Sequence, residues 1–211
     1  MLKMFYDKTK RILDVIISGF VMIFFSPIFL LILFFIWFED HGRPVYSHDR
    51  IGRNGRVFRL YKFRSMVQNA DEILFSDPKL YKEMRSGTHK LVNDPRVTQI
   101  GRLIRKYSLD ELPQFWNVLK GEMSFVGPRA YRPDELEKYR KDHPQNGGSL
   151  DLILSVKPGI TGLWQVKGRS TVSFDERIRI ESIYVRKRGL FLDLWIMLKT
   201  PLAVLQAKGA S

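Results

Sequence analysis

One stretch of this 211-residue chain carries no charged side chain over 24 consecutive residues, from 15 to 38. Seven of the fifteen phenylalanines lie in it. Only four residues interrupt its large apolar side chains: Ser18, Gly19, Ser26 and Pro27. The stretch is longer than the apolar core of a secretory signal, and bulky and charged residues follow it instead of a cleavage site. We therefore expect residues 1–38 to form an N-terminal flank and a membrane anchor.

Both ends of this anchor are basic. The flanking cations are Lys3, Lys8, Lys10 and Arg11 before it and Arg43, Arg50, Arg53 and Arg56 after it. A spanning helix usually has more Lys and Arg on its cytoplasmic side, so this symmetry places both ends on one face. At the midpoint, Pro27 breaks the helical hydrogen bonding and the Ser26 hydroxyl can satisfy a freed carbonyl. The pattern favours a re-entrant helix–break–helix hairpin. A kinked single span stays open as an alternative, because at about 1.5 Å per residue the stretch is long enough to cross.

The rest of the chain, residues 39–211, is expected to form one globular domain docked on the membrane surface, with an α+β fold that is mostly helical and has short strands. Alternation predicts a strand that opens at residue 57. The segments expected to be helical are 71–85 with a break at Asp77-Pro78, 97–106, 109–119, 133–141 and 174–185. Residues 143–148 are expected to form a loop. The apolar C-terminal segment 190–207 is expected to lie in the membrane interface or against the core.

Composition excludes several kinds of site. The chain has no cysteine, so disulfides and thiolate metal centres are ruled out, and its four histidines are too scattered to indicate a zinc site. It also has no glycine-rich phosphate loop, nucleophile elbow or His-Glu-x-x-His motif. The formal charge of +13 suits an anionic partner.

The segment 108–113, Ser-Leu-Asp-Glu-Leu-Pro, has the spacing of a capping box, with Ser108 as N-cap and Glu111 folded back onto it. In that geometry Asp110 would lie in the first helical turn, where the helix dipole favours a carboxylate and a bound phosphate. Cations surround the segment in the sequence: Arg96, Arg102, Arg105, Lys106, Lys120 and Arg129. A carboxylate among cations fits phosphoryl chemistry, because it can attack phosphorus or hold Mg²⁺ while the cations neutralise phosphate oxygens.

Several motifs around this segment occur together. They span residues 62–66, 93–98, 101–102, 105, 108–114, 117–129, 157–166 and 168–169, with the Ser26-Pro27 anchor and the closing segment 193–200. In combination they closely resemble the bacterial sugar transferases called monotopic phosphoglycosyl transferases. The resemblance covers essentially the whole chain and matches the catalytic module, without the extra N-terminal region of longer members.

The resemblance implies transfer of a sugar 1-phosphate from a nucleoside diphosphate sugar, here expected to be a UDP-sugar, to a polyprenol phosphate such as undecaprenyl phosphate, with release of UMP. Asp110 would be the nucleophile that forms an aspartyl-phosphosugar intermediate and would bind Mg²⁺, and Glu111 would assist with the metal or the acceptor. The residues that would bind the substrate phosphates or nucleotide are Lys62, Arg64, Arg105, Arg129 and Arg169. Ala130 stands where the family usually has a second proline, so the geometry of the loop after Gly127 can differ from that of the family.

The expected location is the cytoplasmic face of a bacterial inner membrane, with the phospholipid bilayer as a partner and a homo-oligomer left open. Dispersal of the basic residues among loops and acids argues against a nucleic-acid partner. The main alternative is a membrane-tethered basic protein that binds nucleic acid or lipid without catalysis. A transferase that makes glycosidic bonds is a second alternative, and it would release a nucleoside diphosphate.

Overall fold

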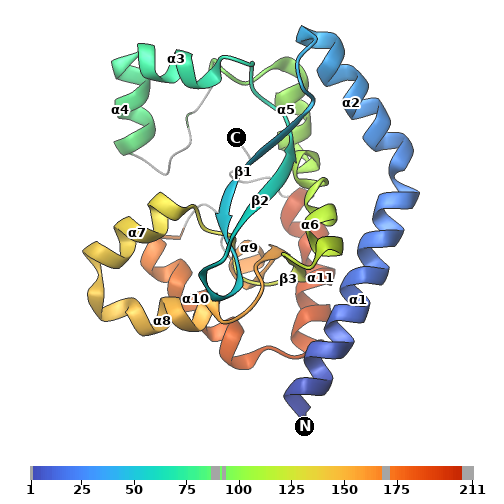
Figure 1. Cartoon of the computed structure of the whole chain (residues 1–211), viewed down its shortest axis with the longest axis vertical. Coiled ribbons are helices and arrows are strands. Elements are labelled where there is room, and N and C mark those ends of the chain that lie inside the picture. Colours follow the sequence, from blue (N-terminus) through green and yellow to red (C-terminus); the bar gives the residue numbers. More distant parts are fainter. Residues whose placement is uncertain (1, 87–90, 92–93, 168–171, 206–211) are drawn as a thin grey trace.

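The computed structural model describes residues 2–86, 91, 94–167 and 172–205. Its fold is α+β and mostly helical, as the sequence predicts (Figure 1). The helices are α1 (Leu2–Phe24), α2 (Ser26–Asp40), α3 (Ala70–Ser76), α4 (Pro78–Ser86), α5 (Gln99–Lys106), α6 (Gln114–Lys120), α7 (Pro133–Asp142), α8 (Gly147–Leu154), α9 (Leu163–Lys167), α10 (Phe174–Lys187) and α11 (Leu190–Leu205). The strands are β1 (Val45–Ile51), β2 (Val57–Phe63), β3 (Ser124–Val126) and β4 (Gly159–Thr161). Short 3₁₀ turns are η1 (Arg53–Gly55), η2 (Leu109–Glu111) and η3 (Pro144–Asn146).

The apolar N-terminal stretch forms two helices that run along one side of the molecule and bend by 61° at their junction (Figure 1). Pro27 cannot donate a hydrogen bond to the carbonyl of Ile23, four residues earlier. The Ser26 hydroxyl donates to that carbonyl instead, at 2.7 Å. The predicted break and its satisfaction by serine are therefore confirmed. Among the described helices none is, by itself, long and apolar enough to cross a membrane, whereas the bent pair α1–α2 meets that test when both helices are counted.

The N-terminal half of α1 is bonded to the globular body. Tyr6 and Lys10 both donate to Asp193 Oδ2 of α11, at 2.9 and 2.6 Å. Arg11 donates to the carbonyls of Val118 and Leu119 at the C-terminal end of α6, which a helix leaves without intrahelical partners. These contacts fix α1 across both the last helix and the middle of the chain.

The second half of the anchor also contacts the body. Ile32 and Ile36 of α2 pack with Phe63 of β2 and Ile104 of α5 in one buried cluster. Because both α1 and α2 pack on the same body, the anchor leaves the body and returns to it.

Two small sheets organise the centre of the described structure. β1 and β2 form an antiparallel hairpin in which Val45 pairs with Phe63 and Ile51 with Val57. β3 and β4 form a short parallel pair in which Ser124 pairs with Gly159 and Val126 with Thr161, and the residues after β3 bond to β4. The sequence predicts the start of β2 but not β1, β3 or β4. Three-residue strands such as β3 and β4 are too short for an alternation pattern to show.

The observed helices agree with most of the expected ones. α3 and α4 divide at Asp77 as predicted, and α7 and α10 match the expected segments closely. Two expectations were wrong. The segment 109–119 is divided into η2 and α6, and part of the expected loop 143–148 is helical, since Gly147 begins α8. Glycine at a helix start is tolerated, because the N-terminal turn places few demands on the side chain.

The C-terminal helix α11 has two faces. Asp193 and Ile196 are buried against the body, and the aromatic and aliphatic side chains on the other side are exposed, with Phe191 at 91% and Leu198 at 76%. Packing against the core is therefore confirmed for one face of the described part of this segment, and contact of the exposed apolar face with the membrane interface stays a prediction.

Candidate active site

The two carboxylates singled out in the sequence lie on η2, between α5 and α6. Ser108 has a left-handed backbone, with φ of 55°, and its side chain makes no capping bond. An N-cap needs an extended backbone and a side-chain oxygen that accepts from the following turn, so the expected capping box is wrong. The left-handed residue instead turns the chain sharply after α5, and Asp110 is buried there, at 9% exposure.

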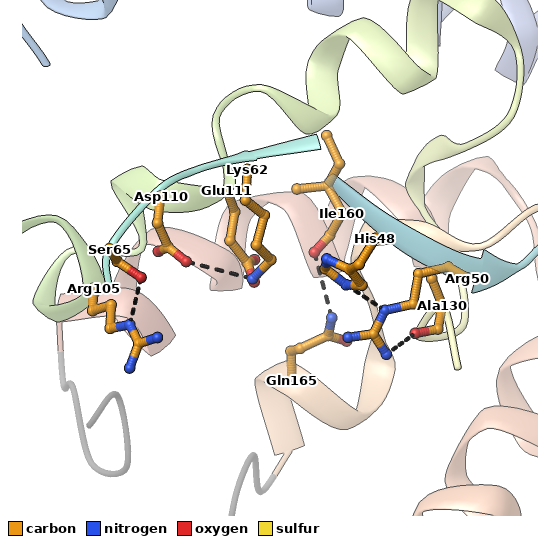
Figure 2. Close-up of polar contacts among 10 residues, drawn as sticks. All are labelled: His48, Arg50, Lys62, Ser65, Arg105, Asp110, Glu111, Ala130, Ile160 and Gln165. Carbon is orange, nitrogen blue, oxygen red and sulfur yellow. Dashed lines mark hydrogen bonds and ion pairs between the residues drawn. The ribbon is translucent and has the colours of Figure 1, made fainter. Parts of the chain in front are cut away.

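Lys62, near the end of β2, joins the two carboxylates. Its ammonium donates to Glu111 Oε1 at 2.7 Å and to Asp110 Oδ2 at 3.4 Å (Figure 2). The residues that the sequence placed in one site, although about 48 positions apart, are therefore in contact. The contact forms because β2, which carries Lys62, packs beside η2.

The electrostatics of this group are set by burial and by charge. Burial raises the pKa of Asp110 above its ordinary value, and the Glu111 charge adds to that rise, while Lys62 and Arg105 oppose it. Burial alone would lower the pKa of Lys62, but the Glu111 and Asp110 carboxylates outweigh it and hold that pKa above its usual value. Lys62 therefore stays a cation at neutral pH. Asp110 keeps a more basic, more reactive carboxylate than an exposed aspartate.

Arg105 lies in the last turn of α5. Its Nε donates to the Ser65 hydroxyl at 2.8 Å, and its guanidinium points away from the Asp110 carboxylate (Figure 2). Burial lowers the pKa of Arg105, and the charges of Asp110 and Asp94 oppose that shift. A guanidinium held near the carboxylate in this way is suited to bind a phosphate oxygen of a substrate.

Arg129 is carried by the loop after β3, residues 127–131, which is held closely against the segment before β4. Gly127 N donates to Thr161 O and Gly159 N to Pro128 O, each at 2.8 Å. A side chain on Gly159 would put its Cβ 2.1 Å from Gly127 N, so only glycine permits this approach.

The side chain of Arg129 is directed onto an aromatic surface. Its guanidinium lies 5.7 Å from the Trp164 ring centroid, and among the described atoms its buried Nε has no hydrogen-bond partner. The charge of Arg129 lowers the pKa of Lys62. Ala130, the departure from the expected proline, packs with Phe58 and Met123.

The sequence did not single out the pair His48 and Arg50 on β1. Arg50 Nε donates to His48 Nε2 at 2.7 Å, and Arg50 Nη1 donates to the Ala130 carbonyl at 3.1 Å (Figure 2). Burial lowers the pKa of His48 to about 3, and the charges of Arg50 and Lys62 add to this, so the imidazole is neutral with its proton on Nδ1. Alternate positions on a strand share one face, so recognising β1 would have placed this pair together.

The other expected substrate-binding residues are placed differently. Arg64, two positions after Lys62, forms an ion pair with Asp40 at the end of α2, with Nη1 2.8 Å from Oδ2, and it also donates to the Ile36 carbonyl. In the described structure its contacts join β2 to α2 and not to the two carboxylates. Arg169 lies outside the described residues.

The fit of Mg²⁺ to this site follows from its donors. Among the described residues there is no group of three or more acidic or histidine side chains that could hold a metal by themselves. Mg²⁺ bound to nucleotide substrates usually takes only one or two carboxylates and completes its shell with phosphate oxygens and water. Asp110 and Glu111 supply that number of carboxylates, so the donor set fits.

A buried carboxylate paired with a lysine and acted on by the charge of an arginine has the composition of an enzyme site for an anionic, phosphorylated substrate. Comparison with known proteins gives the class of enzyme, a transferase. A sequence model described as bacterial sugar transferase matches residues 5–207. The chain therefore belongs to the bacterial sugar transferase family.

Curated relatives agree with this membership. The chain is 46% identical over 205 residues to an uncharacterized sugar transferase of Haemophilus influenzae, covering 95% of this chain and 42% of that protein. It is 45% identical over 208 residues to the undecaprenyl-phosphate galactose phosphotransferase of Salmonella typhimurium, covering 95% and 41%. It is 44% identical over 205 residues to the exopolysaccharide production protein ExoY of Rhizobium meliloti, covering 95% and 87%. The chain thus spans less than half of the first two relatives and most of the third.

Proposed function

We propose that this protein transfers a sugar 1-phosphate from a UDP-sugar to undecaprenyl phosphate, releases UMP, and thereby initiates synthesis of a surface polysaccharide. The observation that carries the proposal is the Asp110 carboxylate, buried and paired with Lys62 in a member of the sugar transferase family. The relatives named for phosphotransfer to undecaprenyl phosphate support the acceptor and the nucleotide sugar.

In the proposed reaction, an Asp110 carboxylate oxygen attacks the sugar-bearing phosphorus of the UDP-sugar. The bond between that phosphorus and the bridging oxygen breaks, and UMP leaves with the electron pair. A phosphate oxygen of undecaprenyl phosphate then attacks the same phosphorus. This second displacement breaks the acyl-phosphate bond and restores the Asp110 carboxylate. Covalent catalysis of this kind divides a two-substrate transfer into two displacements and gives ping-pong kinetics.

The surrounding cations have separate roles in this proposal. Lys62, which is paired with Asp110, and Arg105, whose charge lowers the pKa of that carboxyl, neutralise charge on the transferring phosphoryl group. Arg129, fixed over Trp164, binds the diphosphate of the nucleotide sugar. Arg169 stays a candidate phosphate ligand from the sequence alone. Arg64, occupied by Asp40, is better suited to hold the anchor against β2 than to bind substrate.

Asp110 would hold Mg²⁺, with Glu111 assisting. When bound, the ion would supply Lewis-acid neutralisation of the diphosphate. Glu111 also pairs with Lys62, so it is suited to keep that lysine directed at the site and to orient the incoming acceptor. Metal binding can be measured without turnover by titrating the protein with Mn²⁺, a spectroscopic substitute for Mg²⁺. Loss of this binding in the Asp110→Asn protein would support the metal assignment.

The proposed location is the cytoplasmic face of a bacterial inner membrane, with the bent pair α1–α2 entering and leaving the bilayer on that face. Packing of both helices on one body, together with the basic residues on both flanks, supports this arrangement. The exposed apolar face of α11 adds surface for the interface. A lipid-borne phosphate acceptor requires an active site at the membrane surface, which this arrangement provides.

The nucleotide that the enzyme releases tests the reaction class. Purified protein is incubated with undecaprenyl phosphate, Mg²⁺ and either UDP-galactose or UDP-glucose, and the products are separated by anion-exchange chromatography. Release of UMP is expected. Release of UDP would instead indicate a transferase that makes glycosidic bonds. If neither nucleotide is released and the protein binds DNA or lipid vesicles in a salt-dependent way, the non-catalytic alternative is correct.

A further inference from the structure

We infer that Glu181 is a positioning residue for Arg129. Its carboxylate accepts hydrogen bonds from the loop 127–131 and thereby keeps the Arg129 guanidinium directed at the nucleotide diphosphate. This inference rests on the proposed function, because it assigns Glu181 a role through a proposed substrate ligand. Glu181 lies on α10, 52 residues after Arg129, and no sequence motif singles it out.

The geometry of this contact is specific to the loop. Glu181 is only 1% exposed. Its Oε1 accepts from the backbone N–H of Arg129 at 2.8 Å, and its Oε2 accepts from the Tyr131 hydroxyl. One carboxylate therefore binds the chain on both sides of Ala130. Charge-assisted bonds of this kind are roughly twice as strong as neutral ones, and at a buried site they define the geometry closely.

Other bonds hold the loop at its two ends and leave the Arg129 backbone N–H to Glu181. Gly127 and Pro128 bond to the segment 158–161, whereas Arg50 binds the Ala130 carbonyl and Ile51 N donates to the Tyr131 carbonyl. The Glu181 carboxylate is therefore the group that holds the backbone at Arg129 itself. Loss of it would allow Arg129 to rotate while the loop ends stay fixed.

Charge gives Glu181 a second reason to act on Arg129. Arg129 and Arg177 share the Trp164 ring, at 5.7 and 4.4 Å from its centroid, and each charge opposes the other. The charges of both guanidiniums lower the pKa of Glu181, so its carboxylate attracts both and offsets that repulsion. Glu135, 3.9 Å from Arg177 Nη1, is a further carboxylate in the group, but it pairs only with Arg177 and Arg132 among its recorded contacts. Neutralising Glu181 should therefore release Arg129 more than neutralising Glu135.

A double-mutant cycle tests this coupling. Affinity for UDP is measured by titration calorimetry at pH 8 with Mg²⁺, on the full chain in detergent, for wild type, Glu181→Gln, Arg129→Ala and the double variant. Glutamine keeps the shape and one acceptor but removes the charge. Glu181→Gln is expected to weaken UDP binding about tenfold in wild type and less than twofold when Arg129 is already alanine, because residues that act as one unit are non-additive.

Controls separate positioning from a general loss of structure. Glu135→Gln, which changes a partly buried carboxylate on α7, is expected to change UDP affinity less than twofold. If Glu181→Gln does not fold, Tyr131→Phe removes one of the two loop bonds and is expected to weaken UDP binding about threefold, with the same non-additivity toward Arg129→Ala. A purely structural role would lower thermal stability and give additive effects on binding.

The outcomes distinguish this inference from the proposed function. Additive effects on UDP affinity, or an equal loss from Glu135→Gln, would overturn the inference even if UMP is released. Non-additive effects in a protein that binds UDP but releases no UMP would support the inference and contradict the proposed transfer. A wild-type protein that does not bind UDP would overturn both.

Discussion

The Lys62 ammonium lies 3.4 Å from Asp110 Oδ2, closer than any other basic group recorded against that carboxylate. The two residues come from different elements, β2 and η2, and the contact forms only because the hairpin β1–β2 packs beside α5 and α6. Asp110 is therefore both buried, which raises its pKa, and paired, which keeps its ionised form accessible. That combination suits a carboxylate nucleophile.

Replacing Asp110 by Asn removes the attacking charge and keeps the shape. We expect turnover to fall by at least about a thousandfold, because no other group can form the covalent intermediate. The measurement is UMP release together with circular dichroism to confirm the fold. Asp134→Asn, an exposed carboxylate on α7, is the matched control and should retain full activity. Near-normal turnover in Asp110→Asn with Mg²⁺ present would exclude the covalent mechanism at this residue.

Glu111→Gln separates a catalytic role from a structural one. Glu111 is not part of a capping box, and its ion pair with Lys62 is partly exposed, a kind of pair worth about 0–1 kcal/mol. We expect UMP release to fall about a hundredfold with only a small decrease in melting temperature. A stable and fully active Glu111→Gln protein would show that turnover does not need the Glu111 carboxylate.

Lys62→Met changes the pH dependence of turnover. Asp110 must be ionised to attack, so activity is lost as pH falls through its pKa, which burial already raises. Because Lys62 lowers that pKa, its removal should move the acidic limb of the rate profile to higher pH. Single-turnover UMP release measured across pH gives the limb directly. Lys120→Met, the control, removes a lysine that pairs with Glu122, and should leave the limb in place. If the acidic limb does not move in Lys62→Met, the charge of Lys62 does not lower the pKa of the group that must be ionised.

The bent anchor gives a topological prediction. If α1 and α2 enter and leave on one face, a cysteine at Lys3 should be protected from an impermeant thiol reagent added outside intact cells. Replacing both Ser26 and Pro27 by Ala restores the missing donor and should favour a straighter, spanning helix, with increased labelling. The chain has no native cysteine, so labelling reports this site alone. Outside labelling of the Lys3→Cys protein with an otherwise native sequence would show that the anchor spans.

Asp193 ties the anchor to the body, so its loss should affect stability. It accepts from Tyr6, Lys10 and Tyr184, and Asp193→Asn would leave the Lys10 charge without its carboxylate. Breaking a buried pair in this way costs about 3 kcal/mol. Thermal unfolding in detergent measures the change. Asp151→Asn, which disrupts an exposed pair with Arg140, should cost about 1 kcal/mol or less. Equal effects of the two changes would show that Asp193 contributes no more than a surface charge.

Much of the anchor could be predicted from the sequence because its signals are local. An uncharged run, a central proline and basic flanks are all read within forty residues, and the break at Pro27 depends only on the missing backbone donor. The helices at 133–141 and 174–185 were predicted for the same reason, since their periodicity is contained in the segment. Asp110 and Glu111 were found through a resemblance of motifs and through the neighbouring cations.

The failures were all at positions where distant contacts override a local pattern. Ser108 has the sequence of an N-cap but a left-handed backbone, because the chain must turn from α5 to bring Asp110 next to Lys62. Arg64 looked like a second substrate cation, yet it is paired with Asp40 from the anchor.

The sequence by itself determined the anchor, its break and the residue types of the site, because each depends on neighbours along the chain. Only the tertiary structure decided which residues meet: Lys62 with Asp110, Arg50 with Ala130, and Glu181 with Arg129. Those pairs join elements separated by tens of residues, and their geometry follows from the packing of β2, α6 and α10 around a shared core. Burial, which gives the carboxylates their unusual pKa values, is likewise a property of that packing and not of any single segment.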